Sequence, residues 1–150
     1  MKIVVDKRTL LDLKTIEEIA QCYDLLVQIY VDYSEDTFTC NYAKIVYMDT
    51  YHQNMDLAIL YTMDYGDILI TYDYYLSMAA LLRNISVITP TGQIITKENI
   101  YNAKKIRLLG KKMVTKKIPS RKLQTYSKQL YKNLIPLIEK NLKLLDDIFY

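Results

Sequence analysis

Strand-like and helix-like segments alternate through the first hundred residues, and this order constrains the fold more than any single motif. Short apolar, β-branched runs predict strands at 2–5, 25–31, 44–48, 67–71 and 85–89. Between them, apolar side chains recur at helical spacing and predict helices at 10–21, 53–64 and 74–83. Helices of this kind provide the long crossovers that parallel strands need. We therefore expect an α/β core over residues 1–100, built on a central, mostly parallel five-stranded sheet.

The remaining third of the chain predicts a helical C-terminal extension over residues 101–150, within a single domain that spans 1–150. Thr96 is a candidate helix N-cap, with Asn99 at the position where a capping box usually has Glu or Gln. A long amphipathic helix follows Ser120, and Pro136 predicts a kink or a break inside it. We expect this helix to pack on the domain or on a second copy, so its apolar face permits a homodimer.

The composition limits the cellular compartment and the kinds of functional site that we expect for this chain. No stretch approaches the ~18 uninterrupted apolar residues of a membrane span, and the N-terminal apolar run is too short for a signal peptide, so we expect a cytoplasmic protein without a membrane partner. Cys22 and Cys40 lack metal-site spacing and are expected to be buried, reduced thiols. His52 is the only histidine, which leaves little for a histidine-rich zinc site or a Ser-His-Asp triad.

Charge is divided unevenly between the two parts of the chain. Residues 1–100 contain seven Lys or Arg against fourteen Asp or Glu, whereas residues 101–150 contain thirteen against three. In segment 104–122, nine of nineteen residues are basic and none is acidic. Such a block forms a solvated arm, binds phosphates, or neutralises the charge of the acidic part of the chain. The candidate nucleic-acid-binding residues are Arg8, Lys104, Lys105, Arg107, Lys111, Lys112, Lys116 and Lys117.

Aspartates follow several of the expected strands. Asp6, Asp49 and Asp73 come within two residues of a strand end, and Asp56 lies in the first turns of a helix that starts near the same edge. The functional crevice of a parallel sheet lies at the carboxyl ends of its strands, and carboxylates there could hold Mg²⁺ or Mn²⁺. Aspartates also cap helices and form turns, which is the structural alternative. Only three glycines are present, which argues against Walker-type and Rossmann nucleotide binding.

Three segments carry a resemblance to a known family: MKIVVD at the start, DLAILYTMDYGDILITYDYYLSMAAL at 56–81, and TGQIITKENI at 91–100. Their order and spacing resemble the YaiI/YqxD family, also called the DUF188 or UPF0178 family. The resemblance implies a PIN-like, three-layer α/β domain and a metal-dependent ribonuclease ancestry. It further implies that Asp6, Asp56 and Asp73 are catalytic and bind Mg²⁺ or Mn²⁺, with Asp49 or Asp67 as an additional ligand or outer partner.

The sequence departs from the family pattern near these acids. The family's first loop usually reads V-D-x-D-A-C-P, but here Arg8 stands at the second aspartate and the Cys-Pro pair is absent. The family's D-x-x-D reads Gln53-Asn54-Met55-Asp56, so only its second acid is present. Two functions follow as expectations: a PIN-like nuclease or phosphodiesterase acting on RNA rather than DNA, or a catalytically degenerate module that binds nucleic acid or a protein. Arg8 would pair with Asp6 or Asp73, or bind a phosphate.

Overall fold

The computed structural model of the chain describes residues 1–7, 13–32, 39–49, 54–100 and 120–149. Its centre is a six-stranded sheet in the order β3-β2-β1-β4-β5-β6. The strands are β1 (Lys2–Asp6), β2 (Leu26–Asp32), β3 (Lys44–Met48), β4 (Ile68–Ile70), β5 (Ser86–Ile88) and β6 (Ile94–Ile95). The first five run parallel and β6 runs antiparallel to β5, which confirms the predicted mostly parallel α/β sheet.

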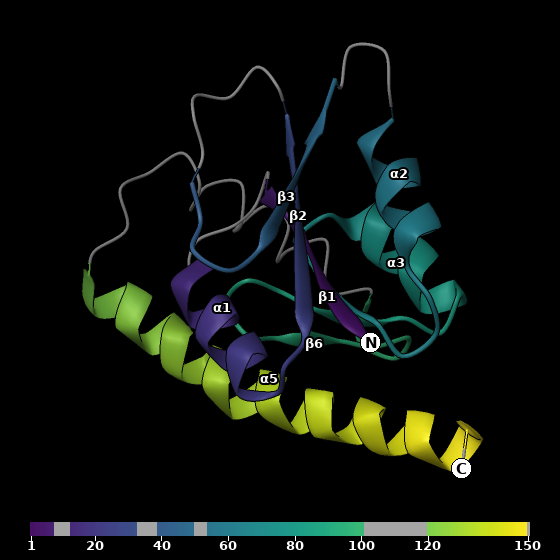
Figure 1. Cartoon of the computed structure of the whole chain (residues 1–150). Coiled ribbons are helices and arrows are strands. Elements are labelled where there is room, and N and C mark those ends of the chain that lie inside the picture. Colours follow the sequence, from purple (N-terminus) through teal and green to yellow (C-terminus); the bar gives the residue numbers. More distant parts are fainter. Residues whose placement is uncertain (8–12, 33–38, 50–53, 101–119, 150) are drawn as a thin grey trace.

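Helices cover both faces of this sheet and make three layers (Figure 1). The helices α1 (Leu13–Cys22) and α5 (Ser120–Phe149) bury side chains against one face, with Ile3, Val5 and Ile29 of the strands. The helices α2 (Met55–Thr62) and α3 (Tyr74–Leu82) cover the other face, around Val4 and Leu69. The alternation along β1 follows from the two-residue period of a strand, and burial on both faces explains its continuous apolar run.

The sheet has one strand more than the five that were expected. After β5 the chain turns at Gly92, whose φ of 89° is the left-handed region that glycine adopts most easily, and Ile94–Ile95 then pairs with β5. A two-residue strand is too short to produce a periodic signal, so the pattern did not predict it. Beyond it, the capping box is confirmed: Thr96 Oγ1 accepts from Asn99 N at 3.2 Å, and Asn99 Oδ1 accepts from Thr96 N at 2.8 Å.

Helix α5 is part of the core. Leu130, Leu134 and Ile138 are at most 1% exposed and belong to the same apolar cluster as the strands. Of the two outcomes expected at Pro136, the break does not occur, because one helix runs from Ser120 to Phe149, but the helix axis bends about midway (Figure 1). None of the helices in the described ranges has the length and apolar run needed to cross a membrane.

The direction of α5 across the sheet is set by two contacts. Near its first half, Asn133 Nδ2 donates to the carbonyl oxygen of Gly92, which follows β5. Near its second half, Asn141 Nδ2 donates at 3.0 Å to the carbonyl oxygen of Gly66, which precedes β4. The helix therefore begins at the carboxyl edge of the parallel strands and ends at their amino edge.

Three polar or thiol side chains lie elsewhere than the pattern predicted. Charged side chains of an amphipathic helix usually face solvent, but Glu17 is 7% exposed. It accepts hydrogen bonds from the backbone N–H groups of Tyr42 and Ala43, directly before β3. Cys22 is exposed and Cys40 is half-buried, so neither is the buried thiol that was expected.

Candidate functional site at the carboxyl edge of the sheet

Asp6 and Asp73 are joined through one hydroxyl group at the carboxyl edge. Asp6 ends β1 and is completely buried, and its Oδ2 accepts a hydrogen bond of 2.9 Å from Thr71 Oγ1. The same Thr71 oxygen accepts the backbone N–H of Asp73 at 3.0 Å. Because β1 and β4 are neighbours in the sheet, their ends bring the two predicted acids into one network. The network lies on the α2/α3 face, since Asp6 alternates with Val5 in the strand.

Asp73 has a structural role as well. It is the N-cap of α3, and its Oδ1 accepts the backbone N–H of Leu76 at 2.9 Å. The side-chain oxygen thereby satisfies one of the unpaired donors at the start of the helix. Asp73 therefore caps α3, which is the structural role that the sequence also allowed, and it is at the same time linked to Asp6 through Thr71.

Asp56 lies in the first turn of α2, half-buried, one position after Met55, which is buried in the core. The cap of this helix is Asn54, whose Oδ1 accepts the backbone N–H of Leu57 at 3.3 Å. A carboxylate in the first turn is favoured by the positive end of the helix dipole. The start of α2 is therefore stabilised by Asn54 as its cap and by Asp56 in its first turn.

Asp49 and Asp67 lie apart from the Asp6–Thr71–Asp73 network. Asp49 follows β3, and β2 separates that strand from β1, so the two strand ends are roughly 10 Å apart. Asp67 precedes β4 and therefore lies at the amino edge of the sheet. There it is buried and accepts from Lys2 Nζ at 2.7 Å, an ion pair that ties the first strand to β4. The expectation that Asp67 supports the acids of the carboxyl edge is wrong, because it stands at the wrong end of its strand.

These positions decide how the acids fit a divalent ion. Within the described ranges, no three His, Cys, Asp or Glu side chains are grouped closely enough to hold a metal. Asp6 is fully buried and hydrogen-bonded, and one oxygen of Asp73 is taken by the helix cap. The described carboxylates therefore do not fit the three- or four-acid cup that the sequence predicted. What the edge does hold is a pair of aspartates linked through Thr71.

Thr71 and Tyr72 are site residues that sequence reasoning did not select. Thr71 lies in the segment 56–81 that resembles the family, two residues before Asp73. This resemblance was the only signal that could have identified it. Tyr72 is 4% exposed, and burial raises the pKa of its phenol to about 12, an effect opposed by the nearby Thr91 and reinforced by Tyr126 of α5. Tyr72 therefore connects the carboxyl edge to the first half of α5.

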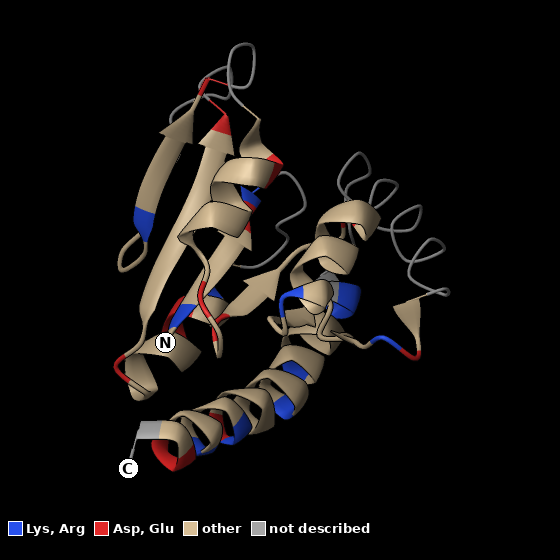
Figure 2. Cartoon of the chain, turned by 90° about the vertical axis from the view of Figure 1, so that its right-hand side faces the viewer, with Lys and Arg blue, Asp and Glu red and all other residues tan. Residues whose placement is uncertain are grey.

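The predicted basic residues Arg8, Lys104, Lys105, Arg107, Lys111, Lys112, Lys116 and Lys117 lie outside the described residues. The described continuation of the basic segment is the first half of α5, where Arg121, Lys122, Lys128 and Lys132 are all exposed. At 100° per residue, Lys128 and Lys132 lie on the opposite side of the helix from the buried Leu130 and Leu134. Figure 2 shows basic residues recurring along α5, with acidic residues at its C-terminal end.

Comparisons with known proteins identify the family. A family model described as "Uncharacterized BCR, YaiI/YqxD family" matches residues 13–143. A UPF0178 protein of Clostridium tetani is 31% identical over 147 residues, which cover 93% of this chain and 98% of the relative. A UPF0178 protein of Natranaerobius thermophilus is 35% identical over 100 residues, which cover 67% of each chain. No solved structure matches the chain. With most of its length matched to the model and to such relatives, this chain belongs to the YaiI/YqxD family.

Proposed function

We propose that this chain binds RNA through a basic surface on the outer side of the first half of α5. The surface is defined by Arg121, Lys122, Lys128 and Lys132, all exposed. Between Glu98 and Glu139 the sequence contains eleven Lys or Arg residues and no acid, so this surface continues a longer basic segment. Ammonium and guanidinium groups bind phosphates by charge and by release of counterions.

The observation that carries the proposal is where the basic surface lies. The first half of α5 packs beside Gly92, at the carboxyl edge of the parallel strands, which is also the edge of the Asp6–Thr71–Asp73 network. Ligands of open α/β sheets bind in the crevice outside this edge. A phosphate backbone bound to the basic surface would therefore pass along the same edge of the sheet as the two aspartates, which lie on the other face. The choice of RNA rests on the resemblance to PIN-like nucleases.

Metal-dependent cleavage of RNA is the second candidate function, and the link between Asp6 and Asp73 favours it. Thr71 links the carboxylate of Asp6 to the backbone N–H of Asp73, so the described residues bring two members of the expected acid set to the same edge. Binding without cleavage is favoured by the replacement of family acids at Arg8 and Gln53. The two candidates differ in whether Mg²⁺ or Mn²⁺ binds at this edge, which can be measured separately from RNA binding.

RNA binding is tested by fluorescence anisotropy with a labelled single-stranded RNA over a range of salt concentrations. The Lys128→Gln/Lys132→Gln variant should bind more weakly, and the slope of log affinity against log salt should fall by about 1.4 if each lysine contacts one phosphate. The matched control is Lys44→Gln/Lys143→Gln, which removes the same charge from exposed residues outside the first half of α5. A flat salt response, or an equal loss in the control, would overturn the proposal.

Metal binding is tested by the melting temperature of the wild-type protein and of Asp73→Asn in increasing Mn²⁺. Asparagine caps helices as well as aspartate does, so this variant should fold normally while it loses the carboxylate charge. If the edge binds Mn²⁺, the metal should stabilise the wild type by about 2.7 kcal/mol at 100 times the dissociation constant, and should stabilise the variant much less. Equal shifts, or none at millimolar Mn²⁺, would leave binding without metal as the function.

A further inference from the structure

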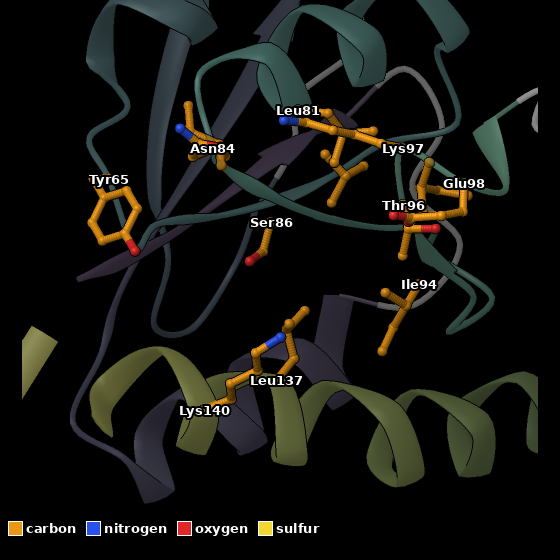
Figure 3. A pocket seen from close by; sticks show the side chains of 13 residues that line it. Tyr65, Leu81, Asn84, Ser86, Ile94, Thr96, Lys97, Glu98, Leu137 and Lys140 are labelled. Carbon is orange, nitrogen blue, oxygen red and sulfur yellow. The ribbon is translucent and has the colours of Figure 1, made fainter. Parts of the chain in front are cut away.

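A hollow lies at the amino edge of the sheet, opposite the carboxyl edge. Its volume is about 540 Å³, and it opens between the start of β5, the end of β6 and the second half of α5 (Figure 3). Leu81, Ile94 and Leu137 contribute apolar walls, and Ser86, Lys97 and Lys140 contribute polar groups. This combination of apolar walls with a few convergent polar groups is typical of small-molecule sites.

Ser86 is held at this hollow by a buried amide. Asn141 is 3% exposed, and its Nδ2 donates at 3.0 Å both to Ser86 Oγ and to the carbonyl oxygen of Gly66. An amide in the core is costly unless its hydrogen bonds are made, so these two bonds position Ser86 tightly. The Ser86 hydroxyl hydrogen has only a long contact of 3.5 Å, to Asn141 Oδ1, which leaves it able to turn toward a ligand acceptor.

Two ammonium groups face the hollow from different elements. Lys140 extends from α5 toward Ser86, and Lys97 crosses the opposite wall beside Leu81 (Figure 3). Neither Lys97 nor Lys140 makes an ion pair within 4.0 Å with another described residue. Glu98 also lines the hollow, but on the side of Thr96, away from Lys140 (Figure 3). The end of the hollow at Ser86 is therefore positive and provides a hydroxyl donor.

We propose that this hollow binds a small phosphate monoester with a flat organic body. The phosphate would accept hydrogen bonds from the Lys140 ammonium and the Ser86 hydroxyl, which are charge-assisted and therefore strong. The body would lie against Leu137 and Ile94, with the exposed ring of Tyr65 at the rim. The site is at the amino edge of the sheet, so it is separate from the RNA-binding surface and does not rest on the proposed function.

Calorimetric titration with adenosine monophosphate tests the site, because this probe carries both a phosphate and a flat ring. The full-length protein should bind adenosine monophosphate, and it should bind adenosine and inorganic phosphate more weakly. The Lys140→Gln variant should bind adenosine monophosphate about tenfold more weakly, since a hydrogen bond to a charged group is lost. Lys143→Gln is the matched control, because Lys143 is exposed on the same helix and does not line the hollow. It should bind like the wild type.

Three results would overturn this inference. They are the absence of binding to the wild type at millimolar probe, an equal loss in Lys140→Gln and Lys143→Gln, and adenosine binding as tightly as its monophosphate. A Ser86→Ala variant gives a second test of the hollow. Its affinity for adenosine monophosphate should also fall, whereas its affinity for adenosine should be unchanged. Melting temperatures of all variants show whether the fold is intact, and Lys140, as an exposed residue, should be replaceable without loss of stability.

Discussion

The buried hydroxyl of Thr71 connects two aspartates and contributes to the stability of the fold. It donates to the carboxylate of Asp6 and accepts the backbone N–H of Asp73, and it is itself fully buried. Replacing it by valine keeps the shape but removes both bonds. A buried group left without its partner costs about 1–3 kcal/mol, so Thr71→Val should lower the free energy of unfolding by roughly that amount. Urea denaturation measures the change.

A matched control for this substitution is Thr125→Val. Thr125 is exposed on α5, and its hydroxyl donates at 3.1 Å to the carbonyl oxygen of Arg121 within the helix. Its loss should change the free energy of unfolding by less than about 0.5 kcal/mol, because water replaces the bond. Equal effects of the two valines would show that the hydroxyl at the carboxyl edge has no special role.

Tyr72 makes the fold sensitive to high pH. Burial raises the pKa of its phenol to about 12, above the unfolded value near 10, so folding favours the neutral form. Its contribution is fully present below pH 10 and is lost as the pH rises through 12, by on the order of 2 kcal/mol. The free energy of unfolding should therefore fall less steeply between pH 10 and 12 in Tyr72→Phe than in the wild type. Tyr61→Phe, at an 83% exposed position, should behave like the wild type.

At the scale of elements, α5 stabilises the sheet through its buried side. Leu134 is 0% exposed in the cluster with the strands, whereas Leu144 is 37% exposed on the same helix. Leu134→Ala should lower the free energy of unfolding by about 2–5 kcal/mol, because it removes apolar contacts and leaves a cavity. Leu144→Ala should cost much less. Chemical denaturation of both variants checks this, and similar values would mean that α5 is not docked as described.

Individual elements also show how accurately sequence patterns predict the ends of helices and strands. The strand at 44–48 was predicted with the bounds that β3 has, because its apolar run ends sharply at Asp49. The helix predicted at 53–64 is shorter in the structure, where the cap is Asn54 and α2 ends at Thr62. Its side chains are apolar on all sides, so periodicity could not locate the ends. The helix continues past Pro136 without a break, because packing of Leu134, Leu137 and Ile138 against the sheet holds it together.

The whole molecule depends on both helical layers. One face of the sheet is covered by α1 and α5 together, so a chain that ends at residue 119 would expose the buried side chains around Ile3 and Ile29. We expect that truncated chain to lose the cooperative unfolding transition of the full chain, because an uncovered apolar face cannot be stable in water. Calorimetry makes the comparison. A cooperative transition at the temperature of the full chain would show that α5 is a dispensable extension.

The sequence by itself determined the α/β class, the parallel strands, the capping box and the family, because each depends on local order and spacing. It also predicted that Asp6 and Asp73 share an edge, since both follow strands of one parallel sheet. Only the tertiary structure decided which strands are neighbours. That order sets β1 beside β4 and links the two aspartates through Thr71, keeps Asp49 two strands away, and places Asp67 at the other edge with Lys2. Strand order comes from packing on both faces at once, and no local pattern records it.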